Sequence, residues 1–282
     1  MPVPFISVLL PTYRQPEVLV QTVRDLNQQT YPTDSWELVV LDDGSFDGSD
    51  IIALETITED IEFTLKRRPV DHGGENEHAN LFNELVRLAD PDTDVFVHVE
   101  DVRLREDFLH HHAKWHQSDQ CNLVTGPMYE APRETFDIED CDRWELMEMG
   151  GDAEAYRCGF RSVWAKTMSY PQELVTRLKE LGGGSPFDGD MEDWGYHEIE
   201  FSYRASYDAD AQCIYDTNCG VYHRPHNPRD ELSHRGIRRE EEKEQGEEQN
   251  IEYICDKHGI DSLPSWETGD PITDLPPLFE LS

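Results

Sequence analysis

The sequence predicts an α/β fold in which helices flank a mostly parallel sheet. Short apolar runs, each long enough for a buried strand, alternate with segments whose apolar residues recur at helical spacing. Acidic pairs follow directly after two of these runs, at the carboxyl ends of strands where open α/β sheets bind ligands. The chain has 282 residues, of which 37% are hydrophobic, so it can bury a core of this kind.

The expected elements follow in order from local patterns. Pro16 suits the first position of a helix, and Leu19, Val23 and Leu26 then recur on one face. A strand–helix–strand–helix order is typical of a parallel sheet. We expect strands at residues 5–10, 36–41, 61–65, 95–99, 122–125, 160–164, 212–215 and 220–223. We expect helices at residues 16–26, 47–57, 82–88, 107–117, 172–181 and 193–204.

The composition changes near residue 227. Residues 1–227 are expected to form the α/β domain, and residues 228–282 a charged helical extension with a Pro-rich tail, packed on the domain or trailing from it. The run from Arg229 to Gln249 is nearly all charged or polar, which is typical of a solvated helix face. Ile251 and Ile254 are the residues expected to pack back on the domain.

The charge balance is strongly acidic, with 60 acidic residues against 24 basic ones and a net charge of −36. This balance argues against non-specific nucleic-acid binding, which needs clustered cations, and against docking on an anionic membrane. The acids are spread along the whole chain and lysines are few, a composition typical of adaptation to high salt, as in a halophilic protein.

The location is predicted from what the sequence lacks. Neither a signal peptide nor a transmembrane run of about 20 apolar residues is present, so we expect a soluble, cytoplasmic protein. The six cysteines show no CxxC motif and no zinc-ligand spacing, which indicates reduced thiols. A bridge between Cys213 and Cys219 is the alternative.

Two adjacent carboxylates, Glu100 and Asp101, follow the apolar run 95–99. Their charges repel unless a cation neutralises them, and a diphosphate-bound Mg²⁺ or Mn²⁺ is usually held by only one or two protein carboxylates. His223 follows another apolar run and is the third candidate ligand. We interpret these residues as a metal site for a diphosphate. The alternative is a pair of solvated acids helped by Arg103 or Arg105, together with a structural histidine.

Two further strings contain candidate site residues. Asp42 and Asp43 precede Gly44-Ser45, and such acids can accept hydrogen bonds from a nucleotide base or ribose, whereas a turn with a helix cap is the alternative. Glu198, in the string Trp194 to Glu200, is expected on the first turn of a helix, where a general base would be rigidly held. An ordinary helix start with acids favoured by the dipole is the alternative there.

Other catalytic patterns are weak or missing. His112 and His116 share a helical face, but no acid completes an HExxH pattern, so a surface or packing role is favoured over metal binding. The sequence contains no GxSxG, P-loop or GxGxxG motif, which disfavours hydrolase, kinase-like and dinucleotide-dependent dehydrogenase functions.

Taken together, these strings resemble glycosyltransferase family 2, a family of inverting enzymes with the Rossmann-like GT-A fold. The resemblance covers roughly residues 5–260 and depends on the order and spacing of the motifs. Glu100-Asp101 stands where the family has a metal-binding DxD motif, and His197-Glu198 replaces its Glu-Asp pair. The matching strings are Phe5–Tyr13, Val39–Asp47, Val97–Asp101, Gly183–Asp188, the galactosyltransferase-like Trp194–Glu198, and Asn250 with Lys257–Gly259.

The resemblance implies a metal-assisted transfer of a sugar, with inversion, from a UDP- or GDP-sugar to a hydroxyl of a glycan or lipid-linked acceptor. Glu198 would be the base, with Glu200 as its competitor. The implied substrate-binding residues are Thr12, Tyr13, Asp42, Asp43 and Trp194, and the implied ligands of Mg²⁺ or Mn²⁺ are Glu100, Asp101 and His223.

Two alternatives belong to other functional classes. The first is a GT-A-fold protein that binds a nucleotide sugar or glycan without transferring it. The second is a nucleotidyltransferase, which is disfavoured because no basic Gly-rich loop near the first strand is available to hold a triphosphate.

Overall fold

The central strands are apolar at nearly every position because helices cover both of their faces. In the computed structural model, β1 (Ile6–Thr12) and β2 (Trp36–Asp42) are buried along their whole length. The structure describes residues 3–45, 47–48, 51, 55–58, 60–69, 78–130, 142–143, 153–181, 184–191, 195–223, 240–264 and 270–278.

The main sheet is mixed, with a parallel half that contains β1 and β2. Within this half β3, β2, β1 and β4 run parallel, and β10 then pairs antiparallel with both β4 and β6. From one edge to the other, the described strands are β13 (Pro271–Ile272), β9 (Ala155–Arg157), β11 (Gln212–Asp216), β6 (Asn122–Thr125), β10 (Ser169–Pro171), β4 (Val95–His98), β1, β2 and β3 (Glu62–Arg67).

A smaller sheet lies next to the end of β4. Its described strands are β5 (Val102–Arg103), β12 (Val221–His223), β7 (Met128–Glu130) and β8 (Asp142–Arg143). Strand β12 pairs antiparallel with β5 and parallel with β7. Because β5 begins one residue after Asp101, this sheet brings distant parts of the chain to the carboxyl end of β4.

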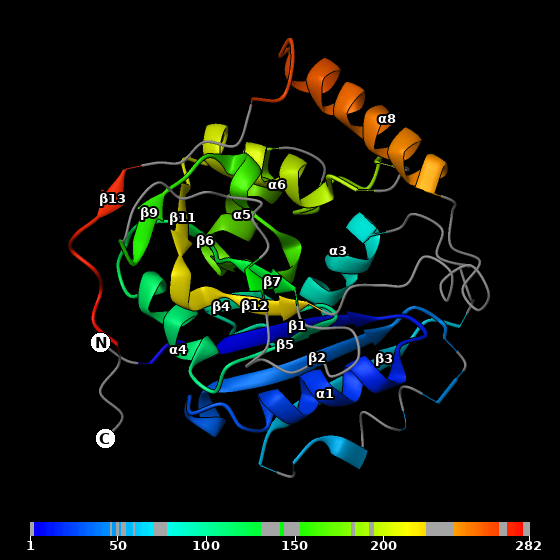
Figure 1. The fold of residues 1–282 in the computed structure, drawn as a ribbon, viewed down its shortest axis with the longest axis vertical. Coiled ribbons are helices and arrows are strands. Elements are labelled where there is room, and N and C mark those ends of the chain that lie inside the picture. The colour runs from blue at the N-terminus through cyan, green and yellow to red at the C-terminus, as the bar shows by residue number, and fades with distance from the viewer. Residues whose placement is uncertain are drawn as a thin grey trace.

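Helices cover the main sheet on both faces (Figure 1). The side chains of a strand alternate between these faces, so Leu9 joins one core and its neighbour Val8 joins the other. One face is covered by α1 (Pro16–Leu26) and α4 (Phe108–Ala113), the other by α3 (His78–Leu88), α5 (Gln172–Leu181) and α6 (His197–Tyr207). Short 3₁₀ helices are η1 (Thr33–Ser35), η2 (Lys114–His116), η4 (Phe160–Ser162), η5 (Ala165–Thr167) and η6 (Thr217–Cys219).

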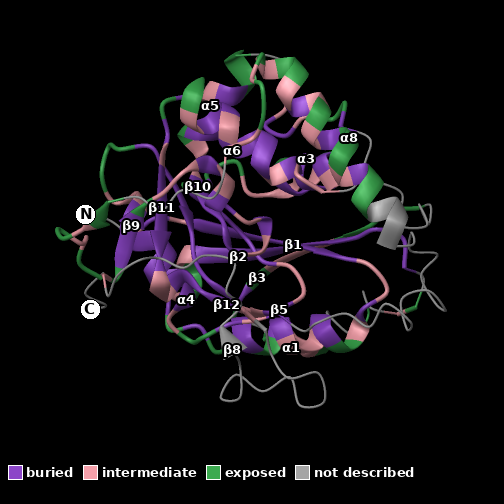
Figure 2. Cartoon of the chain, turned by 45° about the horizontal axis from the view of Figure 1, so that its top comes forward, coloured by how far each residue is buried: buried purple, intermediate pink, exposed green. Residues whose placement is uncertain are grey.

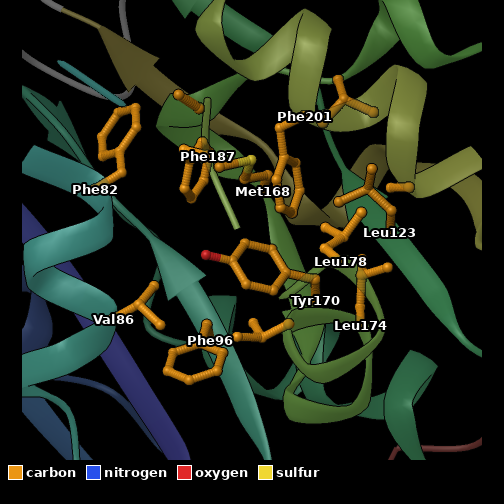
Figure 3. Close-up of a cluster of buried hydrophobic side chains, with 14 of the residues drawn as sticks. Phe82, Val86, Phe96, Leu123, Met168, Tyr170, Leu174, Leu178, Phe187 and Phe201 are labelled. Atoms are coloured by element: carbon orange, nitrogen blue, oxygen red, sulfur yellow. The ribbon is translucent and has the colours of Figure 1, made fainter. Parts of the chain in front are cut away.

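An aromatic cluster forms the centre of the core beneath α3, α5 and α6 (Figure 3). The ring of Phe187 stacks on that of Phe201 with their centroids 4.5 Å apart, and Tyr170 packs against Phe201 at 4.9 Å. The side-chain amide of Asn83 also donates to the Phe187 carbonyl and accepts from its backbone N–H, both at 2.9 Å. These contacts fix the loop 184–191 in front of α6.

The extension contains one long described helix, α8 (Glu240–His258). Ile254 of α8 is fully buried, as the apolar spacing predicts, and Figure 2 shows that the outer surface of the helix is largely exposed. Residues 224–239 lie outside the described residues, so the division at residue 227 stays a prediction. Among the described helices, none combines the length and apolar composition that a membrane span requires.

The mixed, mostly parallel α/β fold confirms the predicted fold class, and helix α5 and strand β6 have the predicted bounds. Pro11 lies within β1 rather than ending it. The Pro11 nitrogen faces β4, but the pairing of β1 with β4 ends at Leu9, two residues earlier. The N–H that proline lacks is therefore not needed for a hydrogen bond between these strands.

One predicted element is wrong and a second is misplaced. The strand expected at residues 160–164 is instead the 3₁₀ helix η4 followed by two residues with extended backbones, and Phe160 and Val163, three residues apart, face the same core. The helix expected at residues 193–204 begins only at His197. Cys213 and Cys219 are free thiols, which excludes a bridge between them. Of the helix expected at residues 47–57, the structure describes residues 47–48, 51 and 55–57, and residues 51, 55 and 56 are helical.

Candidate active site

The two acids at the end of β4 share one cation. The ammonium nitrogen of Lys166, in η5, lies 3.9 Å from Glu100 Oε2 and 4.0 Å from Asp101 Oδ2. The amide of Gln15 donates to Asp101 Oδ2 at 2.8 Å. Asp101 has a left-handed backbone with φ of 53°, which turns the chain sharply after β4. The carboxylates therefore face a common point instead of diverging into solvent.

His223 reaches this region through the smaller sheet. In the antiparallel pairing of β12 with β5, His223 lies opposite Val102, the residue that follows Asp101. The histidine is buried, with 9% of its surface exposed. The register thus brings the backbone of His223 opposite the residue after Asp101, although more than a hundred residues separate them in the sequence. Among the described residues, the ligand atoms of Glu100, Asp101 and His223 do not form a group within 4.8 Å of one another.

Asp42 organises the turn at the end of β2. Its Oδ1 accepts from the backbone N–H of Ser45 at 3.0 Å and from the Ser45 hydroxyl at 2.5 Å. Thr12 lies opposite Asp42 in the pairing of β1 with β2, and the Thr12 carbonyl accepts from the Asp43 N–H at 3.0 Å. Arg68 contacts Asp43 at 3.0 Å. The turn is therefore stabilised by its own acids, as the turn alternative predicts.

The loop between β1 and α1 connects the Asp42 turn with the acidic pair. The backbone N–H of Arg14 donates to the Ser45 hydroxyl at 2.7 Å, and the next residue, Gln15, contacts Asp101. The Arg14 guanidinium lies 5.1 Å from the centre of the Tyr13 ring. Thr12, Tyr13, the Asp42 turn and the acidic pair thus lie along one edge of the sheet, at the carboxyl ends of β1, β2 and β4.

Glu198 and Glu200 have opposite electrostatic environments. Burial and the charge of Glu100 together raise the pKa of Glu198 to about 7, although a hydrogen bond from its own backbone and the charge of Lys166 each lower the pKa. Glu198 thus interacts electrostatically with Glu100 of the acidic pair and with Lys166. Burial alone would also raise the pKa of Glu200, but hydrogen bonds from His258, Arg204 and Lys257 lower it to about 2. Glu198 is thus the carboxylate whose affinity for a proton suits a general base.

A second cluster of potential metal ligands contains a lysine. Ligand atoms of His111, Glu154 and Asp216 lie within 4.8 Å of one another. The Lys114 ammonium is 2.7 Å from Asp216 Oδ2 and 3.1 Å from Glu154 Oε1. The Trp115 indole N–H donates to Asp216 at 2.7 Å. Lys114 already supplies the positive charge that a metal would bring, so this cluster serves as a partly buried ion-pair network in which Glu154 is exposed.

His112 and His116 are structural. Nδ1 of His112 and Nε2 of His116 lie 2.8 Å and 2.9 Å from the same Ser169 hydroxyl. Burial lowers the pKa of His116 to about 3 and lowers the pKa of His112 well below its usual value, so both rings are neutral at pH 7. The packing role favoured by the sequence matches this geometry.

Sequence reasoning missed Lys166 and Gln15, which touch the acidic pair. Lys166 belongs to no recognisable motif, and only the folded chain reveals its position. Gln15 follows the opening motif directly, so its place after β1 was the available signal. Trp194, a predicted substrate-binding residue, lies outside the described residues.

Comparison with known proteins identifies the family. Residues 7–171, more than half of the chain, match the model of glycosyl transferase family 2. The glycosyltransferase AglE of Haloferax volcanii is 38% identical over 55 residues, which cover 20% of this chain and 18% of AglE.

Several solved structures share the fold. The mannosyltransferase PcManGT from Pyrobaculum calidifontis, in complex with GDP-Man and Mn²⁺, has a TM-score of 0.58 and 19% identity over 79% of this chain and 57% of that chain. S. aureus TarS 1–349 with UDP-GlcNAc has a TM-score of 0.58 and 16% identity over 79% and 59%. Glucosyl-3-phosphoglycerate synthase from Mycobacterium tuberculosis, with Mg²⁺ and UDP, has a TM-score of 0.52 and 17% identity over 91% and 80%.

These structural likenesses concern the fold, because the identities are low. The chain spans under two thirds of PcManGT and under one fifth of AglE. The match over residues 7–171 and the GT-A-like architecture confirm the family and fold that the motifs predict. The chain belongs to glycosyltransferase family 2.

Proposed function

We propose that the protein transfers a sugar from a nucleoside-diphosphate sugar to an acceptor hydroxyl, with inversion and with the help of a divalent metal. The observation that carries this proposal is the electrostatic coupling of Glu198 to Glu100 and to Lys166, which itself lies 3.9 Å from Glu100. A base with a raised pKa is thus coupled to the acids that we propose for the diphosphate site. Membership of the family supports the reaction class.

Glu100, Asp101 and His223 would hold the metal. Carboxylate oxygens and an imidazole nitrogen fit Mn²⁺, and carboxylates fit Mg²⁺. PcManGT is described with Mn²⁺ and the mycobacterial synthase with Mg²⁺, which supports either ion here. When bound, the ion would offset negative charge on the departing nucleoside diphosphate. Lys166 lies close to the same acids and would help to offset the negative charge on the departing nucleoside diphosphate.

The nucleotide would lie along the edge formed by Thr12, Tyr13, Asp42 and Asp43, with Trp194 as a further contact. The loop that holds Thr12 and Tyr13 also contacts Asp101 through Gln15, so nucleotide and diphosphate sites would be continuous. The donor would be a UDP- or GDP-sugar, the two classes found with TarS and PcManGT.

Glu198 would act as the base. Its carboxylate would accept the proton of the acceptor hydroxyl as that oxygen attacks the anomeric carbon. The nucleoside diphosphate would leave from the opposite face of the sugar, which gives inversion. Glu200 is a poor base because its carboxylate is held by Arg204 at 2.8 Å and by Lys257 at 2.7 Å.

The remaining proposals concern the whole protein. We propose a GT-A domain at residues 1–227 and a helical extension at residues 228–282. The acceptor would be a glycan or a lipid-linked glycan. The acidic surface is consistent with a halophilic protein, and the proposed location is the cytoplasm.

Release of nucleoside diphosphate from a panel of UDP- and GDP-sugars, with and without Mn²⁺ in molar salt, tests this function. We expect metal-dependent release that Glu198→Gln abolishes and that Glu252→Gln, an exposed acid on α8, leaves unchanged. A protein that binds the nucleotide with Mn²⁺ but releases nothing above the Glu198→Gln background would instead be a non-catalytic binder.

A further inference from the structure

Helix α6 begins with a turn that its own sequence does not stabilise. Gly195 and Tyr196 both have left-handed backbones, with φ of 86° and 66°. The conformation costs about 1–2 kcal/mol for a residue such as tyrosine, so it persists only where neighbouring structure holds it. Glu198 lies two residues after this turn, so the turn determines where the carboxylate points.

Helix α8 contacts this turn directly. The side-chain amide of Asn250 donates to the carbonyl of Gly195 at 2.7 Å, and Asn250 is 2% exposed. A Cβ atom at Gly195 would lie 3.2 Å from Cγ of Glu247, so α8 is packed closely against the turn. Asn250 thus satisfies the carbonyl of a left-handed residue at the start of α6.

The same helix also holds the other side of the first turn of α6. The Lys257 ammonium lies 2.7 Å from Glu200 Oε1 and 2.5 Å from Asp188 Oδ2, and the His258 ring lies 3.2 Å from Glu200. Tyr253 donates to Asp188 at 2.8 Å.

These contacts come from one face of α8. Residues 250, 253, 254 and 257 recur at helical spacing, and Figure 1 shows α8 lying across the outside of α6. Helix α8 therefore holds the chain three residues before Glu198 and two residues after it.

We propose that α8 positions the Glu198 carboxylate for catalysis, with Asn250 as the positioning residue. The inference rests on the proposed role of Glu198 as the base. The amide of Asn250 fixes the turn, the turn fixes the first residues of α6, and these residues orient the carboxylate toward the acceptor. Asn250 itself touches neither donor nor acceptor, so its loss should change the rate of the chemical step and leave donor binding unchanged.

The test uses the full chain with Asn250→Ala and the matched control Glu252→Gln, which lies exposed on the opposite face of α8. Steady-state nucleoside diphosphate release gives kcat and KM for the donor, and titration of UDP or GDP with Mn²⁺ gives the nucleotide affinity. Asn250→Asp keeps the size of the side chain but replaces the amide donor with a negatively charged acceptor, and it replaces the alanine variant if that variant does not fold.

We expect Asn250→Ala to lower kcat at least about tenfold, because small displacements of a catalytic group are costly. KM and nucleotide affinity should stay within about twofold of wild type, since the site at the strand ends is intact. The backbone amides of the first turn of α6 should also exchange hydrogen faster in Asn250→Ala. The control Glu252→Gln should change neither kcat nor this exchange rate.

Three results would overturn the inference. A folded Asn250→Ala protein with a lower Tm and an unchanged kcat would show that Asn250 contributes to stability but does not position Glu198. A raised KM with an unchanged kcat would place Asn250 in donor binding. A wild-type chain that releases no nucleotide from any donor would overturn the proposed function, and this inference with it.

Discussion

Lys166 places its ammonium nitrogen 3.9 Å from Oε2 of Glu100, beside the carboxylate that we propose as a metal ligand. The lysine also lies 4.0 Å from Asp101 Oδ2, so it neutralises part of the acidic pair. A divalent cation that binds these oxygens has to compete with this ammonium. Lys166 therefore competes with the metal for the carboxylates, and it could also bind the negatively charged diphosphate.

Replacing Lys166 should separate these two effects. We expect Lys166→Met to bind Mn²⁺ about threefold to tenfold more tightly without nucleotide, because a competing charge worth about 1 kcal/mol is removed. Mn²⁺ titration followed by electron paramagnetic resonance measures this affinity directly. Lys179→Met, which removes an exposed lysine of α5, is the control and should leave the affinity unchanged. Weaker Mn²⁺ binding by Lys166→Met would contradict the proposed competition.

The raised pKa of Glu198 predicts a pH dependence of activity. A general base works only when it is deprotonated, so turnover should rise as the pH increases through the pKa of about 7 and then level off. The measurement is kcat/KM against pH at constant molar salt. A rate that stays level from about pH 5 to pH 9 would exclude Glu198 as the essential base.

The same group should make the folded state less stable at high pH. Because the folded pKa of Glu198 is raised above 4.5, its contribution is fully present below pH 4.5 and is lost as the pH rises through about 7. We therefore expect Glu198→Gln to raise Tm relative to wild type at about pH 8 and to matter little at about pH 4. An equal Tm of the two proteins at both pH values would contradict the raised pKa of Glu198.

Glu200 should behave in the opposite sense. Its folded pKa is lowered to about 2, so its stabilisation is present above pH 4.5 and is lost as the pH falls toward 2. Glu200→Gln should cost about 3 kcal/mol of unfolding free energy at pH 7, measured by denaturant unfolding. The difference from wild type should shrink as the pH approaches about 3.

Helix α5 offers a matched control for Glu200→Gln. Glu173 and Arg177 form the same i,i+4 pair at 2.6 Å as Glu200 and Arg204 at 2.8 Å, but the Glu173 side chain is 56% exposed. Glu173→Gln should therefore cost less than about 1 kcal/mol. A similar cost for both variants would mean that burial does not determine the strength of the Glu200 network.

The outer face of α8 predicts a salt requirement. Glu244, Glu248, Glu252 and Asp256 are exposed and follow one another at intervals of four residues, so like charges repel along the helix. Salt screens this repulsion, and Tm should fall as the salt concentration is lowered.

Glu248→Lys converts two repulsive neighbours into attractive ones, each worth roughly 0.5 kcal/mol, and should raise Tm mainly at low salt. Glu180→Lys makes the same change in net charge on α5, at an exposed position with no acid four residues away. If both variants raise Tm equally, the salt dependence comes from the net charge of the protein and not from the row of acids on the outer face of α8.

The predictable part of the site was local. A buried strand followed by acids identifies the carboxyl end of a strand, so the positions of Asp42 and of Glu100 relative to the sheet followed from the sequence. The same holds for Glu198, which lies on the first turn of α6. These features depend on residues close together in the chain.

The rest depended on long-range geometry. His223 lies beside Val102 because two short strands pair, and no local pattern specifies that register. The choice between Glu198 and Glu200 depends on Lys257 and His258, which come from another helix. The start of α6 was misplaced because the left-handed turn at Tyr196 is stabilised by α8 rather than by a sequence signal of its own.

The most direct measurement is the binding of UDP or GDP to the full chain in molar salt, followed by thermal shift with and without Mn²⁺. Wild type should gain Tm only when nucleotide and metal are both present, because a ligand that binds the native state stabilises it. The double variant Glu100→Gln, Asp101→Asn should lose this metal-dependent gain. An undiminished gain in the double variant would show that the acids at the end of β4 do not hold the metal and the diphosphate.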